Sequence, residues 1–303
     1  MTAAQELAPA TTLEELRHVP GLRRRQVWAG IWNTVFFLAT TFALVALGAL
    51  FWYILSRGWD WMSWGLVTNS ASRNAESAGL NIAIYGTLWI ISLTILIAFP
   101  MGVAAGIYLE EYAPKNRWTR MLQVNISNLA GVPSVVYGLL GLGIFVEWLD
   151  LGRVVLAGAL TMALLSLPVI IISTQEALKA VPWSLREAAY GVGATRWQVT
   201  ASHVLPAAFP AILTGVILAV SRAIGETAPL LVAGAAGFIS SKPDSFTDSY
   251  TTIPIQLYGW MARPQNEFRD LAAAGIVVLL GLLIMMNSVA IILRQRYSGK
   301  ARW

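Results

Sequence analysis

The chain has 303 residues, of which 56% are hydrophobic and only 12% charged, whereas about a quarter of the residues in soluble domains are charged. A folded core cannot bury that much apolar surface, so the composition excludes an ordinary soluble protein and indicates a lipid environment. The lack of cysteine excludes disulfides and thiolate metal sites. The net charge of +5 is best explained by membrane-orientation signals, and we expect no nucleic-acid partner.

The amino-terminal segment consists of a polar tail and a long apolar run. Residues 1–25 contain prolines, acidic residues and three consecutive arginines, and we expect a mobile cytoplasmic tail there. Residues 26–56 carry no charge, and this run is longer than the roughly 7–15 residues of a signal-peptide core. It therefore predicts an uncleaved first transmembrane helix.

Further apolar segments are long enough to cross a bilayer, which takes about 20 helical residues. They cover residues 77–109, 121–146, 154–175, 205–239 and 271–293. We therefore predict an all-α integral membrane protein with six transmembrane helices. The last five would form a core over residues 77–294, followed by a cytoplasmic C-terminus over residues 295–303.

Lysine and arginine set the expected orientation, because they concentrate on the cytoplasmic side of membrane proteins. With six spans, the side that holds both termini carries more than twice as many of these residues as the other side. We therefore expect both termini in the cytoplasm. The loops 57–76 and 240–270 would face outward, and the long loop 176–206 would face the cytoplasm.

The loop 176–206 is far longer than most connections between packed helices, and such loops usually carry a function. Ser184 and Glu187 have the spacing of a capping box, which predicts a short helix from about residue 185 to 190. Gly191 and Gly193 follow and can supply a left-handed helix stop.

The small side chains Ala188 and Ala189 would give this helix a narrow face that another protein can approach closely. A second amphipathic stretch, residues 195–204, leads to Leu205-Pro206 and the next span. The loop therefore predicts a protein-binding helix at the membrane surface.

The loop also resembles a known motif. Glu187-Ala-Ala-Tyr-Gly-Val-Gly193 is followed by nine residues and then His203-Val-Leu-Pro206, which is similar in spacing to the EAA loop of ABC importer permeases. The family usually has isoleucine or valine where this chain has His203. The resemblance implies that the loop forms a coupling helix that docks on a separate ATPase subunit, through Ser184, Glu187, Ala188, Ala189 and Gly193.

Other segments resemble the phosphate permeases of the PstA type within that family and imply the type I importer permease fold. They are Ile84-Tyr-Gly-Thr87 with Tyr108-Leu-Glu-Glu-Tyr112, Ala130-Gly-Val-Pro-Ser-Val-Val-Tyr-Gly138, Ser221-Arg-Ala-Ile-Gly-Glu-Thr-Ala-Pro-Leu230, and Thr252-Ile-Pro-Ile-Gln-Leu-Tyr258. These segments extend from the second span to the last outer loop.

Arg222 is a candidate substrate-binding residue, because an ionised group inside a span costs about 2.5 to 3.5 kcal/mol and usually marks function. It lies about 24 Å along the fifth span, if that helix is straight. A guanidinium suits an oxyanion. Glu226, on the same helix face, would hold the Arg222 guanidinium in place or compete with the anion for it. Thr227 adds a hydroxyl, and Pro229 is expected to break or kink the helix. The alternative is an ion pair that only joins helices.

Residues 130–134 interrupt the third span with glycine and proline. The freed backbone groups need protein neighbours or a water-lined cavity. Ser134 and Tyr137 would then face that cavity and the substrate path. The alternative is a kink that serves packing alone.

The resemblance implies an ATP-driven importer of inorganic phosphate that works by alternating access in the bacterial inner membrane. It also implies a second permease of the PstC type, two ATPases of the PstB type that bind ATP and magnesium, and an external binding protein of the PstS type. This chain has no P-loop pattern, so we expect neither cofactor nor enzymatic activity. His18 and His203 are too isolated to suggest a metal site.

Three alternatives remain open at the level of sequence. The substrate of an ABC permease with these motifs could be another oxyanion, such as sulfate or molybdate. An ion-driven secondary transporter or channel would need no ATPase and leaves the EAA spacing unexplained. A membrane enzyme is disfavoured because no catalytic set can be assembled.

Overall fold

The computed structural model describes residues 22–235 and 239–298. The predicted tail up to residue 21, three residues of the predicted fifth span and residues 299–303 lie outside the described residues. The chain divides into two units, Met1–Ser56 and Arg57–Trp303, and each is described separately below.

The first unit contributes one long helix. α1 (Leu22–Gly58) has 37 residues and runs into the start of the second unit. Its apolar side chains, including Phe36, Phe42 and Trp52, are exposed. Residues 26–56 of this helix carry no charge, and such a stretch with exposed apolar side chains suits lipid as its solvent, so the predicted first span is confirmed as a helix able to cross a membrane.

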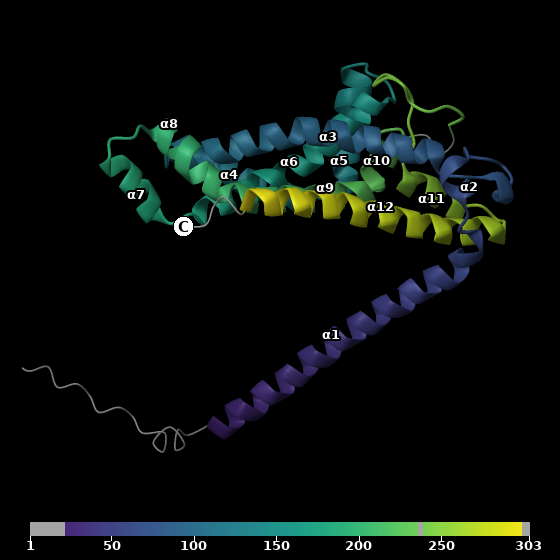
Figure 1. Ribbon diagram of the computed structural model, residues 1–303, viewed down its shortest axis with the longest axis horizontal. Coiled ribbons are helices and arrows are strands. Elements are labelled where there is room, and N and C mark those ends of the chain that lie inside the picture. Colours follow the sequence, from purple (N-terminus) through teal and green to yellow (C-terminus); the bar gives the residue numbers. More distant parts are fainter. Residues whose placement is uncertain (1–21, 236–238, 299–303) are drawn as a thin grey trace, which may run out of the picture. The chain divides into compact units, whose positions relative to one another are not determined.

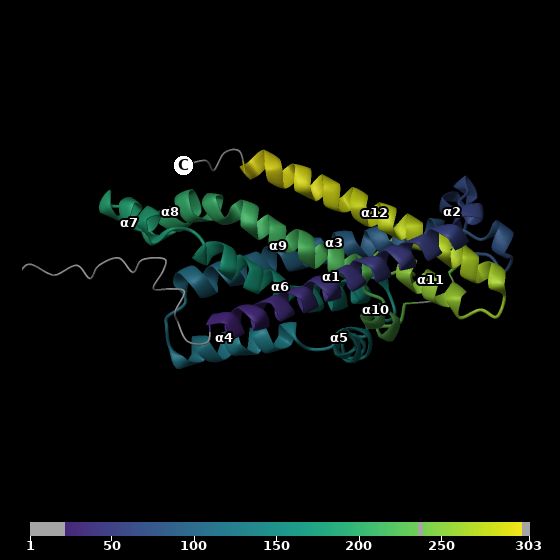
Figure 2. The same cartoon turned by 90° about the horizontal axis from the view of Figure 1, so that it is seen from below.

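In the second unit, four long helices run side by side (Figures 1 and 2). They are α3 (Asn81–Ile107), α6 (Val155–Lys179), α9 (Leu205–Gly225) and α12 (Asn266–Ser298). Shorter helices connect them: α2 (Trp64–Thr68), α4 (Arg117–Ala130), α5 (Ser134–Gly141), α7 (Trp183–Gly191), α8 (Arg196–Val199), α10 (Ala228–Val232) and α11 (Ile253–Met261). Single turns of 3₁₀-helix form η2 (Trp59–Trp61) and η3 (Ala75–Ser77), and π-helical turns form η4 (Tyr108–Tyr112), η5 (Leu142–Trp148) and η6 (Thr200–Val204).

The described residues contain five helices able to cross a membrane, or six if the bent pair α4 and α5 with η5 counts as one span. The predicted all-α membrane fold is therefore confirmed. α7, α8 and the C-terminal end of α12 lie at one end of the second unit, whereas α2 and α11 lie at the other (Figure 1). We call the first of these the coupling-loop end.

Small residues allow α3 and α6 to pack closely. A Cβ atom added to Gly102 would lie 2.6 Å from Ile170 Cγ2, and one added to Gly106 would lie 2.6 Å from Thr174 Cβ. Between these helices Thr94 Oγ1 donates a hydrogen bond to the Ala159 carbonyl at 3.4 Å. In lipid, helix association depends on such close packing rather than on hydrophobicity.

The predicted third span is bent by 104° between Arg117–Ala130 and Ser134–Trp148. Figure 2 shows α5 almost end-on while α4 lies along the bundle. Pro133 lacks an N–H group and disfavours helical backbone at the preceding Val132, so the helix cannot continue through this point. The predicted interruption at residues 130–134 is therefore confirmed.

The predicted fifth span also ends early. α9 stops at Gly225, Glu226 has extended backbone angles (φ −74°, ψ 123°), and α10 starts at Ala228. Pro229 occupies the first turn of α10, where its missing N–H group leaves no helical bond unmade. The expected break is confirmed, and Glu226 lies at the break itself.

Candidate functional site

Helix α7 begins one residue before Ser184. Pro182 occupies the N-cap position without a side-chain cap, and Leu185 N donates to the Pro182 carbonyl at 3.2 Å. The predicted capping box of Ser184 and Glu187 is therefore wrong. Proline has a fixed φ that suits the residues at a helix start, so the helix starts at Trp183 and places Ser184 inside the first turn.

A capping box does occur later in the same loop, at Thr195. Thr195 Oγ1 accepts from Gln198 N, and the Gln198 side chain accepts from Thr195 N at 2.8 Å. This box starts α8, which continues through η6 into α9. The predicted second amphipathic stretch is therefore the first part of one helix that runs from Arg196 to Gly225.

The end of α7 has the geometry that the glycines predict. Gly193 has φ +85°, Ala194 N donates to the Ala189 carbonyl at 3.1 Å, and Gly193 N donates to the Tyr190 carbonyl at 2.9 Å. These two bonds form a Schellman motif, in which a left-handed residue satisfies the last helical carbonyls. Gly193 therefore fixes the direction in which the chain leaves α7.

One face of α7 is exposed and the other is packed against the chain itself. Ser184, Glu187 and Ala188 lie on the exposed face, as their i, i+3 and i+4 spacing requires. Ala189 is buried in the core with Val199 and Val204. The expectation that both alanines form an open face is therefore wrong for Ala189, because it lies on the inner side of the helix.

Large apolar side chains are exposed on α7 and on the segment that follows it. They are Trp183, Tyr190, Val192 and Trp197, of which Val192 is 85% exposed. The coupling-loop end thus presents a helix with a C-terminal cap, an exposed carboxylate at Glu187 and several exposed aromatic side chains.

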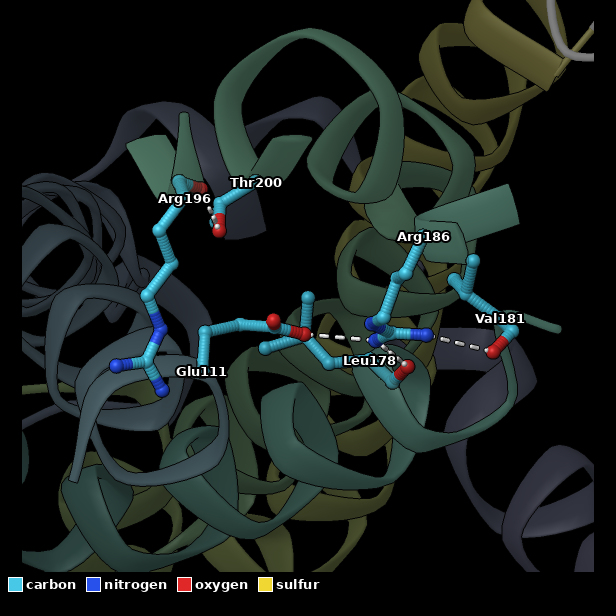
Figure 3. A network of polar contacts seen from close by, with 6 residues as sticks. All are labelled: Glu111, Leu178, Val181, Arg186, Arg196 and Thr200. Carbon is cyan, nitrogen blue, oxygen red and sulfur yellow. Dashed lines mark hydrogen bonds and ion pairs between the residues drawn. The ribbon is translucent and has the colours of Figure 1, made fainter. Parts of the chain in front are cut away.

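Arg186 holds α7 against the bundle. Its Nη1 donates to the Val181 carbonyl at 2.9 Å, and its Nη2 donates to the Leu178 carbonyl at 3.0 Å and to Glu111 Oε1 at 2.7 Å. Figure 3 shows the guanidinium between these groups. The ion pair is nearly inaccessible, with 6% of the Arg186 side chain and 10% of the Glu111 side chain exposed.

This arrangement connects three elements. Leu178 lies in the last turn of α6 and Val181 two residues beyond its end, where the helix dipole favours a cation. Glu111 belongs to η4, the π-helical end of α3. Nearby, the Arg196 guanidinium lies 5.3 Å from the centroid of the Tyr112 ring. Sequence analysis missed Arg186 and Glu111 as site residues, because 75 positions separate them and nothing local indicates the pairing.

The second candidate site lies where α9 and α5 are interrupted. Arg222 Nε lies 3.1 Å from Glu226 Oε1, and 52% of the Arg222 side chain is exposed. The structure therefore brings together the two charged residues that the sequence placed on one face. It leaves the guanidinium accessible on the surface of the chain.

The two breaks are packed against each other. A Cβ atom added to Gly138 of α5 would lie 2.8 Å from Pro229 Cα of α10. The segment with Ser134 and the segment with Arg222, Glu226 and Thr227 thus meet in one region.

Tyr137 has a different place from the one expected. Only 2% of it is exposed, and its hydroxyl donates to the Leu129 carbonyl at 2.8 Å. The residue therefore joins α5 to the end of α4 across the bend, rather than facing a cavity in this conformation. Ser134 and Thr227 are partly exposed.

Arg222 is an exposed charge within a candidate membrane span, and this constrains what can lie beside it. Gly131, Pro133, Arg222 and Gly225 are all exposed, and interrupted backbone is tolerated in a bilayer only inside protein or beside water. A guanidinium facing lipid is costly as well. This face must therefore line an aqueous path or contact another subunit.

Comparison with known families settles the class of the protein. Residues 98–299 match the family model described as "Binding-protein-dependent transport system inner membrane component". The chain belongs to this family. It is therefore a multi-pass inner-membrane permease component of an ABC importer, which is not itself catalytic and which works with a binding protein and an ATPase.

Relatives support the same assignment. The permease is 33% identical over 277 residues to the "Phosphate transport system permease protein PstA" of Yersinia pestis, covering 88% of this chain and 92% of that protein. It is 31% identical over 272 residues to "Phosphate transport system permease protein PstA 1" of Mycobacterium tuberculosis (strain CDC 1551 / Oshkosh), covering 86% and 88%.

The solved structures show the fold. The permease matches a chain from "Crystal structure of a bacterial ABC transporter involved in the import of the acidic polysaccharide alginate" with a TM-score of 0.59. The match covers 89% of this chain and 99% of that one at 16% identity. The permease thus has the ABC importer permease fold. Within its described residues, no three His, Asp or Glu side chains gather closely enough to hold a metal ion.

Proposed function

We propose that this permease imports inorganic phosphate. The observation that carries the proposal is the accessible Arg222–Glu226 pair at the junction of two helix breaks. Two relatives are named as phosphate transport permeases, and the chain matches each of them over most of its length. These matches support phosphate as the substrate. The proposal names one substrate, whereas the members of the family share only the role of permease.

The chemistry of the pair suits a small oxyanion. A guanidinium offers a planar set of donors that matches phosphate oxygens in charge and geometry. Glu226 already accepts from Arg222 Nε at 3.1 Å, so an arriving anion competes with a carboxylate for the same donors. This competition keeps the bound anion weakly held, which a transport pathway requires.

Neighbouring hydroxyls complete the proposed path. We include Ser134, in the first turn of α5, and Thr227, before α10, as further donors to the anion. Tyr137 contributes from the core by holding the bend that presents Ser134. Of the residues expected on the path, Arg222, Glu226, Thr227 and Ser134 therefore contact the anion, and Tyr137 positions them.

The coupling-loop end is the proposed ATPase-docking surface. Ser184, Glu187 and Ala188 contact the ATPase directly, whereas Ala189 and Gly193 set the position and direction of the helix. A helix capped at its C-terminus and anchored through Arg186 transmits displacement to α3 and α6 without bending. We assign residues 176–206 as the coupling loop within a core of residues 77–294.

The proposed assembly follows the family. A second permease of the PstC type covers the Arg222 face, two ATPases of the PstB type bind the cytoplasmic loops, and a PstS-type protein delivers phosphate outside. Both termini, residues 1–25 and 295–303, lie in the cytoplasm of a bacterium. ATP binding and hydrolysis by the partner ATPases switch the path between outward and inward states.

Uptake of labelled phosphate into membrane vesicles containing the complete importer tests the proposal. Arg222→Gln is expected to reduce uptake at least about tenfold, since it removes a charge-assisted contact, while the subunits still co-purify. Arg73→Gln, which alters an exposed cation outside the predicted spans, is the control and should leave uptake unchanged. Normal uptake by Arg222→Gln removes this residue from the path, and inhibition of uptake by sulfate as strong as by arsenate contradicts phosphate as the substrate.

A further inference from the structure

A cavity of about 590 Å³ opens at the coupling-loop end of the bundle. Its walls come from η4 at the end of α3, from the start of α4 and from the end of α6. The helical spans that contain α3 and α6 end at Tyr112 and Lys179. The cavity therefore lies at the depth where a bilayer changes from hydrocarbon to headgroups.

Cations dominate the lining of this cavity. Lys115, Arg117, Arg120 and Lys179 line it, with Glu110 as the carboxylate among them. Lys179 is already paired with Glu176 at 2.9 Å. Within the described part of the chain, Lys115, Arg117 and Arg120 make no ion pair, so the cavity has an uncompensated positive charge that favours an anionic group.

An apolar strip continues from the cations along α4. Met121 follows Arg117 by four residues and Val124 follows Arg120 by four, so each pair shares one helix face. Both Met121 and Val124 are exposed, as is Trp118 beside them. Tryptophan prefers the boundary between headgroups and hydrocarbon. Cations at the start of α4 followed by exposed apolar side chains match an anion that carries apolar tails.

We propose that this cavity binds the phosphate group of an anionic phospholipid, whose acyl chains lie along Met121 and Val124. Basic pockets between membrane helices bind such headgroups. Free inorganic phosphate has the same charged group but makes no use of the apolar strip. The bound lipid would contact η4 beside Glu111, and thereby the element that anchors the coupling helix.

Native mass spectrometry of the full-length protein, released from micelles containing equal phosphatidylglycerol and phosphatidylcholine, tests the proposal. The wild-type protein is expected to retain phosphatidylglycerol in preference to phosphatidylcholine. Arg117→Gln with Arg120→Gln should weaken that retention about tenfold or more, because each cation near a membrane surface contributes about 1 kcal/mol. Arg73→Gln, which alters an exposed cation that does not line the cavity, should retain the lipid as the wild type does.

Further measurements distinguish a lipid phosphate group from free inorganic phosphate and test whether lost retention reflects misfolding. Met121→Ser with Val124→Ser should lower lipid retention, whereas inorganic phosphate in millimolar excess should not displace the lipid. Lys115→Gln, in an exposed loop, should weaken retention without affecting folding. Equal retention of both lipids, wild-type retention by the double arginine variant, or full displacement by inorganic phosphate would each overturn the proposal.

Discussion

Arg186 Nη2 lies 2.7 Å from Glu111 Oε1, and this buried pair joins α7 to the end of α3. The same guanidinium binds two carbonyls at the end of α6. Force applied to α7 is therefore applied to α3 and α6 as well. A surface loop with no such anchor would bend instead of moving the helices that cross the membrane.

Replacing one residue of the Arg186–Glu111 pair is expected to lower the free energy of unfolding more than replacing both residues. Arg186→Met or Glu111→Leu alone leaves a buried charge unpaired and should cost about 3–5 kcal/mol, whereas the double variant should recover much of that loss. Thermal unfolding in detergent measures the effect.

Lys179→Met is the matched control for this cycle, because it breaks the exposed Lys179–Glu176 pair at the same end of the bundle. Such exposed pairs contribute about 0–1 kcal/mol. If Arg186→Met and Glu111→Leu each unfold at the same temperature as this control, Arg186 does not anchor α7.

Gly193→Ala is expected to destabilise the end of α7. The residue has φ +85°, and left-handed backbone costs an L-residue with a side chain about 1–2 kcal/mol. Hydrogen exchange of the α7 amides should become faster, because the Schellman motif weakens. Gly191→Ala is the control, since Gly191 is helical and an added Cβ there meets nothing within 4 Å; equal exchange in both variants would contradict the role of Gly193.

Gly106→Val is expected to separate α3 from α6. An added Cβ would lie 2.6 Å from Thr174 Cβ and 3.1 Å from the Ile171 carbonyl oxygen, and overpacking of this kind typically costs about 1–3 kcal/mol. The yield of folded protein and its unfolding temperature should both fall. Gly143→Ala, where nothing lies within 4 Å, should change neither, and a normal unfolding temperature for Gly106→Val would show that the helices do not depend on this contact.

Tyr137→Phe tests whether this residue holds the bend or contacts the substrate. Loss of the hydroxyl removes its bond to the Leu129 carbonyl, which still accepts from Val132 N at 3.0 Å, so the change should cost about 0.5–1.5 kcal/mol of stability. The substrate concentration for half-maximal uptake should stay unchanged. Tyr258→Phe, at an exposed tyrosine, is the control for stability; a weaker apparent affinity for phosphate without loss of stability would instead place Tyr137 on the path.

Local patterns were sufficient for some features of the site. Gly193 was expected to stop α7 because a left-handed backbone favours glycine, and Pro133 was expected to interrupt the third span because proline lacks a donor. The capping box predicted at Ser184 is wrong, because Pro182 occupies the N-cap position of α7 and leaves Ser184 inside the first turn.

The sequence by itself determined the membrane environment, the helical spans, the places where they break and the coupling-loop motif. These properties depend on apolar run length and on residues adjacent in the chain. Only the tertiary structure decided that Arg186 pairs with Glu111, that Gly138 meets Pro229, and that Ala189 and Tyr137 face inward. Such contacts join positions far apart in sequence, and they depend on how the helices pack and rotate about their axes, which no single helix's sequence specifies.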